Sequence, residues 1–216
     1  MKGNFIWALP TLRRNNSALK AIGFAVNDWQ LSGIWTASTG GTTSGTGSGA
    51  YSIAYSYSSG GSNVNITGSP DYPGRVRIVG DPGSGCSSNP YRQFNTAAFE
   101  GPPIGSVGLD SGAGYLKGCF QSALDLAIAR NIRAGRGRTL QLRVDMFNAP
   151  NSSIITDRNN SMNLNGPSDP TRITNLPYDA NGNLITTRSQ PKNAGFGVAR
   201  NYQAPRSLQI LVRFSF

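Results

Sequence analysis

The stretch SLQILVRFSF, residues 207–216, decides how the rest of the chain is interpreted. Every second position is apolar, and this period of two is typical of a β-strand whose two faces meet different surroundings. A half-buried strand of a soluble sandwich has the same pattern. We interpret the closing phenylalanine as favouring a strand that turns its apolar face toward lipid. The apolar positions are Leu208, Ile210, Val212, Phe214 and Phe216.

Two earlier segments, 122–134 and 138–149, alternate in the same way and predict a hairpin. Their apolar positions are all even-numbered: Leu124, Leu126, Ile128, Ile132, Leu140, Leu142, Val144 and Met146. Pairing apolar with apolar residues requires an odd number of turn residues, and Gly135-Arg136-Gly137 supplies three, with glycine for the left-handed position. This register places Ile128 opposite Val144 and Ile132 opposite Leu140.

The other face of this hairpin is polar and charged. It carries Asp125, Asn131, Arg133, Gln141, Arg143 and Asp145. Apolar outside and polar inside, over strands of roughly 9–11 residues, is the arrangement that a membrane barrel requires. We therefore expect Asp125, Arg133, Gln141, Arg143 and Asp145 to face a lumen. Arg130 interrupts the apolar face near the turn, where its side chain can reach lipid headgroups.

Two further segments, 3–9 and 28–38, bring the predicted strands to five, with 206–216 as the last. Their alternating aromatic residues suit an interfacial girdle and equally a packed core. The connections 39–121 and 150–205 are very long, as in the outer loops of outer-membrane barrels. Residues 1–216 are thus predicted to be all-β: an antiparallel, up-and-down transmembrane β-barrel segment of about five strands with long extracellular loops.

Composition excludes several classes of function. The chain has no His, which removes His-based triads and the usual zinc sites. Its ten acids are scattered, so we expect no enzyme, no metal site and no cofactor. The net charge of +10 is spread along the chain without a recognition helix, so nucleic acid is not an expected partner.

Two cysteines, Cys86 and Cys119, lie in sequence that is rich in Gly and Ser, and they are interpreted as an oxidised pair in an outer loop. A disulfide favours an extracytoplasmic setting, yet residues 1–9 do not form a signal peptide. We therefore expect a fragment of an exported protein. The Gly-rich run 45–49 lacks the context of a phosphate loop, and residues 179–183 predict a tight Asn-Gly turn rather than a calcium loop.

Several runs together resemble the C-terminal barrel of TonB-dependent receptors, and among these the Oar-like group whose members carry an N-terminal carboxypeptidase-regulatory-like domain. No single run is diagnostic, but their order and spacing are fairly specific from about residue 28 onward. The runs are QLSGIW (30–35), GDPG (80–83) with YRQFNTAAF (91–99), LDLAIARN (124–131), LRVDMFN (142–148) and VRFSF (212–216).

The resemblance implies a bacterial outer-membrane location and energised uptake of an unidentified solute. It implies four partners: lipid, the barrel-assembly machinery that reads the closing strand, an upstream plug with further barrel strands, and the TonB complex. No TonB box or plug domain is identifiable here, so contact with TonB would be made only through missing regions. A different hypothesis is a secreted β-rich module that binds carbohydrate through loops bearing Tyr51, Tyr55 and Tyr57.

Overall fold

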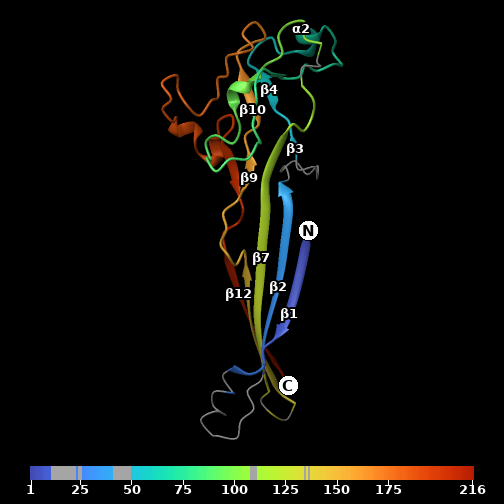
Figure 1. The fold of residues 1–216 in the computed structure, drawn as a ribbon, viewed down its shortest axis with the longest axis vertical. Helices are drawn as coiled ribbons and strands as arrows, with labels where there is room; N and C mark the ends of the chain where they lie inside the picture. Colours follow the sequence, from blue (N-terminus) through green and yellow to red (C-terminus); the bar gives the residue numbers. More distant parts are fainter. Residues whose placement is uncertain (11–22, 24–25, 41–49, 108–110, 134, 136) are drawn as a thin grey trace. The chain divides into compact units, whose positions relative to one another are not determined.

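The structure, a computed structural model, describes residues 1–10, 23, 26–40, 50–107, 111–133, 135 and 137–216. The chain folds into two compact units (Figure 1). Unit 1 consists of Met1–Ser38, Ser122–Ser153 and Ala204–Phe216, and unit 2 consists of Thr39–Gln121 and Ile154–Gln203. Unit 2 therefore contains the two long connections between the strands of unit 1.

The large sheet is built from long strands in the order β1-β2-β7-β8-β12. Each strand lies beside the next long strand of the sequence, which is the up-and-down order that was predicted, and Figure 1 shows β1, β2 and β7 side by side. The antiparallel, mostly β class is thereby confirmed. Among the described residues the sheet is open, with β1 and β12 outermost. The strands are β1 (Lys2–Ala8), β2 (Trp29–Gly40), β7 (Leu116–Arg133), β8 (Thr139–Phe147) and β12 (Ser207–Ser215).

The predicted register of the β7–β8 hairpin is confirmed. Ile128 pairs with Val144 and Ile132 pairs with Leu140. The pairing stops one residue earlier on each strand than predicted, because β7 ends at Arg133 and β8 begins at Thr139. In the turn, the N–H of Arg138 bonds to the carbonyl of Gly135 at 3.0 Å. Register survives because shortening both strands equally leaves the parity of the pairing unchanged. Gly135 and Gly137 have φ of 75° and 80°, which other residues rarely adopt.

Strand β7 begins at Leu116, six residues before the predicted boundary at 122. The prediction failed there because Lys117, Gly118 and Cys119 do not continue the apolar alternation. Cys119 consequently lies in a strand and is 8% exposed, and it is not in a loop as predicted. Residues 116–121 belong to unit 2, and the rest of β7 belongs to unit 1.

Unit 2 holds short strands, one short helix and three 3-10 turns among its described residues. Strand β4 pairs with β10 in parallel, β9 with β11 and β5 with β6 in antiparallel, and β3 pairs with β7. The elements are β3 (Ala50–Tyr51), β4 (Ala54–Tyr57), α2 (Asn63–Thr67), β5 (Arg77–Ile78), η1 (Thr96–Ala98), β6 (Phe99–Glu100), β9 (Ile155–Arg158), β10 (Ser161–Leu164), η2 (Thr186–Arg188), η3 (Pro191–Asn193) and β11 (Ala199–Tyr202).

The expectation of long, irregular loops is wrong for most of these connections, because unit 2 has a hydrophobic core. The core comprises Tyr51, Ile53, Val76, Phe94, Ala98, Phe99, Leu116, Met162, Leu164 and Phe196. Its members come from both connections, and in the sequence they stand singly among Gly, Ser and Asn. Such spacing gives no local period, so a sequence pattern does not reveal that the residues meet. The run 45–49 lies outside the described residues.

The Asn-Gly turn predicted at 179–183 is confirmed. The N–H of Asp179 bonds to the carbonyl of Asn183 at 2.9 Å, and Gly182 has φ of 83°. The Asp179 carboxylate accepts the backbone N–H of Asn183 and of Asn181, and these bonds, with that of Asn183 first, hold the pKa of the carboxyl below its ordinary value. No helix among the described residues is long and apolar enough to cross a membrane.

Candidate membrane-embedded surface

The even-numbered apolar residues of β7, β8 and β12 meet in register across three strands and form an apolar ladder. In its second rung, Val144 stands between Ile128 and Ile210. Because side chains alternate along each strand, all the rungs lie on one face of the sheet. The four rungs are Leu126-Met146-Leu208, Ile128-Val144-Ile210, Arg130-Leu142-Val212 and Ile132-Leu140-Phe214.

The same face continues over β2 and β1. The indole N–H of Trp35 donates to Ser122 Oγ at 2.9 Å, which places Trp35 on the face that carries Leu126. Phe5 pairs with Gly33, where an added Cβ would run into the Phe5 ring and the Leu126 side chain. Glycine at this position lets the aromatic ring lie across β2.

This apolar face is open to its surroundings. Ile210 is 74% exposed and Phe216 is 98% exposed, whereas among the described residues of unit 1 the buried apolar side chains are the small Ala37 and Ala127. Monomeric soluble proteins rarely expose contiguous apolar surface on this scale. In β2, Trp29 is the first residue of the strand and Trp35 lies near its middle, so Trp29 alone of the two has the position that an interfacial belt of a bilayer would require.

The opposite face of the three-strand ladder is polar, as the register predicts. Its rungs are Ala127-Asp145-Gln209, Ala129-Arg143-Leu211, Asn131-Gln141-Arg213 and Arg133-Thr139-Ser215. Arg143 and Asp145, two residues apart on one strand, form a tight ion pair, with Nη2 to Oδ1 at 2.8 Å and Nε to both carboxylate oxygens at 2.9 and 3.1 Å. The residues predicted to face a lumen thus share one face of the sheet.

Arg130 is the charged residue of the apolar face. Its guanidinium lies over the Trp29 ring at 5.6 Å, and its Nε donates to the carbonyl of Asn27 at 3.2 Å. The sequence suggested that this side chain reaches toward headgroups. In the structure it is held at the start of β2 by an aromatic face and a backbone carbonyl, both of which favour a cation, and its reach toward headgroups stays a prediction.

Asp125 has a structural partner rather than an open site. Its Oδ1 accepts the N–H of Asn148 at 2.9 Å, and Asn148 is buried with φ of 49°. The Asn148 side chain donates to the carbonyls of Ser152 and Ala204 at 2.9 and 2.8 Å. The buried side-chain amide of Asn148 therefore links the end of β8 to the segment that precedes β12. These hydrogen bonds offset the energetic cost of the left-handed backbone at Asn148.

In unit 2 the structure joins the two cysteines that the sequence singled out. Cys86 and Cys119 form a disulfide with Cα atoms 5.0 Å apart, inside the range that an unstrained bridge allows. Beside it lies Arg158, which is 4% exposed. Its Nη2 is 3.5 Å from Cys119 Sγ, and its guanidinium lies 5.2 Å from the centre of the Tyr51 ring. Sequence reasoning did not find Arg158, because an arginine between Asp157 and Asn159 looks like a surface residue.

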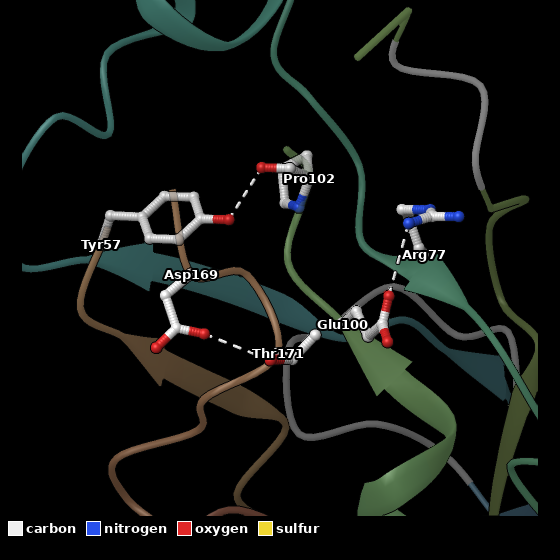
Figure 2. A network of polar contacts seen from close by, with 6 residues as sticks. All are labelled: Tyr57, Arg77, Glu100, Pro102, Asp169 and Thr171. Carbon is white, nitrogen blue, oxygen red and sulfur yellow. Dashed lines mark hydrogen bonds and ion pairs between the residues drawn. The ribbon is translucent and has the colours of Figure 1, made fainter. Parts of the chain in front are cut away.

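The tyrosines of 50–57 face the core of unit 2 instead of solvent. Tyr51 is 7% exposed and donates its hydroxyl to the carbonyl of Gly85 at 2.7 Å, and burial raises its pKa. Tyr57 packs against the core and donates to the carbonyl of Pro102 at 2.7 Å, as Figure 2 shows. Burial raises the pKa of Tyr57 to about 12.

Polar side-chain contacts nearby in unit 2 join two paired strands and stabilise one turn. Arg77 of β5 pairs with Glu100 of β6 at 3.4 Å, across two strands that also pair through their backbones (Figure 2). Thr171 donates to Asp169 at 3.2 Å within one turn. These side chains hold neighbouring segments together, and each has its partner inside the same unit.

A family model for an outer membrane beta barrel domain matches residues 1–209. The chain belongs to this family. The match covers nearly all of the sequence, and it accounts for a sheet that is apolar on one face and polar on the other. Membership of this family places the chain in the bacterial outer membrane. Comparison with curated proteins and with solved structures finds no match.

Proposed function

We propose that this chain is part of a TonB-dependent outer-membrane receptor that takes up a solute. The observation that supports this most directly is the three-strand apolar ladder backed by a charged face, in a chain of the outer membrane β-barrel family. Several short segments of the sequence resemble TonB-dependent receptors, and this resemblance is the reason for proposing that the uptake is energised. We expect the chain to bind and pass its solute without transforming it.

The dimensions of the strands agree with a membrane role. Strand β12 has nine residues, and at a rise of about 3.4 Å per residue and a tilt of roughly 40° it spans about 23 Å. This is close to the apolar band of about 25 Å that outer-membrane barrels present. In this proposal the Arg143–Asp145 pair and its polar neighbours line the interior.

The open sheet defines what else the barrel needs. Each unsatisfied backbone group in lipid costs several kcal/mol, so the outer edges of β1 and β12 require neighbouring strands. We propose that these strands, and a plug, come from another part of the same polypeptide. The apolar positions 208–216 of the closing strand are proposed as the signal that the barrel-assembly machinery reads. The TonB complex would engage regions other than these.

Unit 2 is proposed to lie outside the cell. It consists of the two long connections that follow β2 and β8 in the sequence. Long connections belong to the outer side of such barrels. The Cys86–Cys119 disulfide suits an oxidising exterior. The carbohydrate module hypothesis has no support from the tyrosines on which it rested, because Tyr51 and Tyr57 pack into unit 2.

Uptake is tested by comparing spent growth medium. Three cultures are kept in the same medium: a strain that lacks the protein, the same strain complemented with the gene, and the complemented strain treated with a protonophore. The solutes that remain in each medium are measured by untargeted mass spectrometry. The expected result is at least one solute that only the untreated, complemented cells deplete. Depletion that needs the protein but not the energised inner membrane would identify a passive pore. Identical depletion in all three cultures would contradict a role in uptake.

A further inference from the structure

Arg158 is a buried cation whose surroundings lack a matching anion. It ends β9, is 4% exposed, and its Nε is buried with no hydrogen-bond partner among the described residues. The neighbouring acid on the strand, Asp157, pairs instead with Arg200 at 4.0 Å. A buried guanidinium is costly unless an anion or a set of acceptors compensates for its lost hydration. The Nη2 of Arg158 lies 3.5 Å from Cys119 Sγ.

The two sulfurs of the disulfide have different environments. Cys119 is 8% exposed in β7, with Arg158 on one side and Gln93 Oε1 at 3.9 Å. Cys86 is partly buried, in a loop between the buried Gly85 and the partly buried Ser87. The Gln93 amide holds this loop by donating to the carbonyls of Ser87 and Asn89, both at 2.8 Å. Cys86 is therefore the more exposed of the two cysteines, and an external thiol is expected to reach it first.

We propose that a thiol–disulfide exchange protein acts on this disulfide through Cys86, and that Cys119 is always the sulfur that departs as a thiolate beside Arg158. The partner's thiolate attacks Cys86 Sγ, a bond between the partner's sulfur and Cys86 forms, and the Cys86–Cys119 bond breaks with its electron pair remaining on Cys119. A second thiol of the partner then attacks the mixed disulfide and releases Cys86. The partner dithiol is oxidised by two electrons and the bridge is reduced by two.

The reverse sequence makes the bridge when the partner arrives oxidised. Cys86 forms the mixed disulfide with the partner, and the Cys119 thiolate attacks Cys86 Sγ and expels the partner's thiolate. Arg158 assists in both directions. A stabilised thiolate is a faster leaving group, and it keeps Cys119 ionised and ready to close the bridge. The assignment is independent of any transported solute.

Of the groups that face Cys119, Arg158 at 3.5 Å favours a thiolate, whereas the acceptor oxygen Gln93 Oε1 at 3.9 Å favours the protonated thiol. Tyr51 of β3 donates its hydroxyl to the carbonyl of Gly85 and stays neutral, because burial raises its pKa. Lys117, on the same strand as Cys119, is an exposed cation. Burial by itself would disfavour the thiolate, so burial and the guanidinium predict opposite signs. A purely structural role for Arg158 would leave the effect of burial dominant.

The first test uses the unmodified protein in phospholipid vesicles with reduced glutathione as the probe. The reaction is quenched with acid at early times, and the mixed disulfides are mapped by peptide mass spectrometry. Glutathione is expected on Cys86 at least about tenfold more often than on Cys119, by the access and leaving-group arguments. Equal labelling, or labelling mainly on Cys119, overturns the proposal.

The second test isolates the thiolate in the variant Cys86→Ser. Its thiolate absorbance near 240 nm is followed against pH, and the midpoint is expected below the ordinary thiol value of about 8.5. Adding Arg158→Lys should keep the midpoint low, while adding Arg158→Met should move it above that value. A midpoint above about 8.5 in Cys86→Ser itself refutes the role of Arg158. Because the first test needs no substitution, poor folding of an Arg158 variant does not prevent a decision.

Discussion

Replacing Ile210 by arginine should destabilise the protein in a bilayer far more than the same change one residue away. Ile210 is 74% exposed at the second rung of the apolar ladder, beside Val144. It lies one residue from the midpoint of β12, so in a barrel it is near the middle of the apolar band. Arginine on the lipid face at this depth costs about 2–4 kcal/mol. That corresponds to a loss of roughly 30- to 700-fold in the folding equilibrium constant.

Gln209→Arg provides the matched control. Gln209 belongs to the opposite face and pairs with Asp145, so an arginine there meets water and a carboxylate. Opposite charges across a strand pair contribute roughly 0.2–1 kcal/mol, which makes this change neutral or slightly favourable. The two variants carry the same new charge on adjacent residues and differ in the face that receives it.

The assay is reversible denaturant titration of the complete outer-membrane protein in phospholipid vesicles, followed by tryptophan fluorescence. The folded fraction on unheated gels gives an independent measure. The reasoning predicts that Ile210→Arg lowers the free energy of unfolding by at least about 2 kcal/mol relative to Gln209→Arg. If the two variants are equally stable, or Gln209→Arg is the weaker one, the assignment of the faces is wrong.

Three further changes test other parts of the structure. Phe99→Ala should destabilise unit 2 by about 3–5 kcal/mol because Phe99 is 2% exposed. Phe120→Ala, at a residue that is 59% exposed, should have little effect. The stability of the two variants is compared by the resistance of unit 2 to protease. Deleting Phe216 should lower the amount of folded barrel in the outer membrane, as quantified in membrane fractions, and unchanged levels would contradict its role in assembly. Burial raises the pKa of Tyr57 from 10.0 to about 12, so stability should be constant below pH 10 and fall as the pH rises to about 12. Denaturant midpoints across that window should show a shallower fall in Tyr57→Phe, and no fall in the native protein would refute the burial effect.

The membrane-facing sheet was predictable because its information is local. Alternation along β7 and β8 fixes which side chains share a face, and a slip of one residue would exchange the faces. Ile128 opposite Val144 follows from parity alone, and the structure has that pair. The boundary of β7 was predicted wrongly, because the strand continues back to Leu116 through residues that break the alternation.

The disulfide illustrates an intermediate case. Two cysteines in an exported chain suggest an oxidised pair, and the structure joins Cys86 to Cys119. The different environments of the two sulfurs could not be inferred, because Arg158 reaches Cys119 from 39 residues further along the chain. Only the folded structure shows that the Arg158 guanidinium lies beside the disulfide.

The sequence by itself determined the fold class, the register of the β7–β8 hairpin and the polarity of its two faces, because a strand of period two carries these properties in consecutive residues. Only the tertiary structure decided that the long connections form unit 2. The parallel pairing of β4 with β10 joins residues that are 107 apart, and Phe196 of the second connection packs against Phe94 and Phe99 of the first. Contacts of that kind have no local period, since the residues between them neither alternate nor repeat. They form because apolar side chains that are distant in the sequence are buried together, and this becomes visible only in the folded structure.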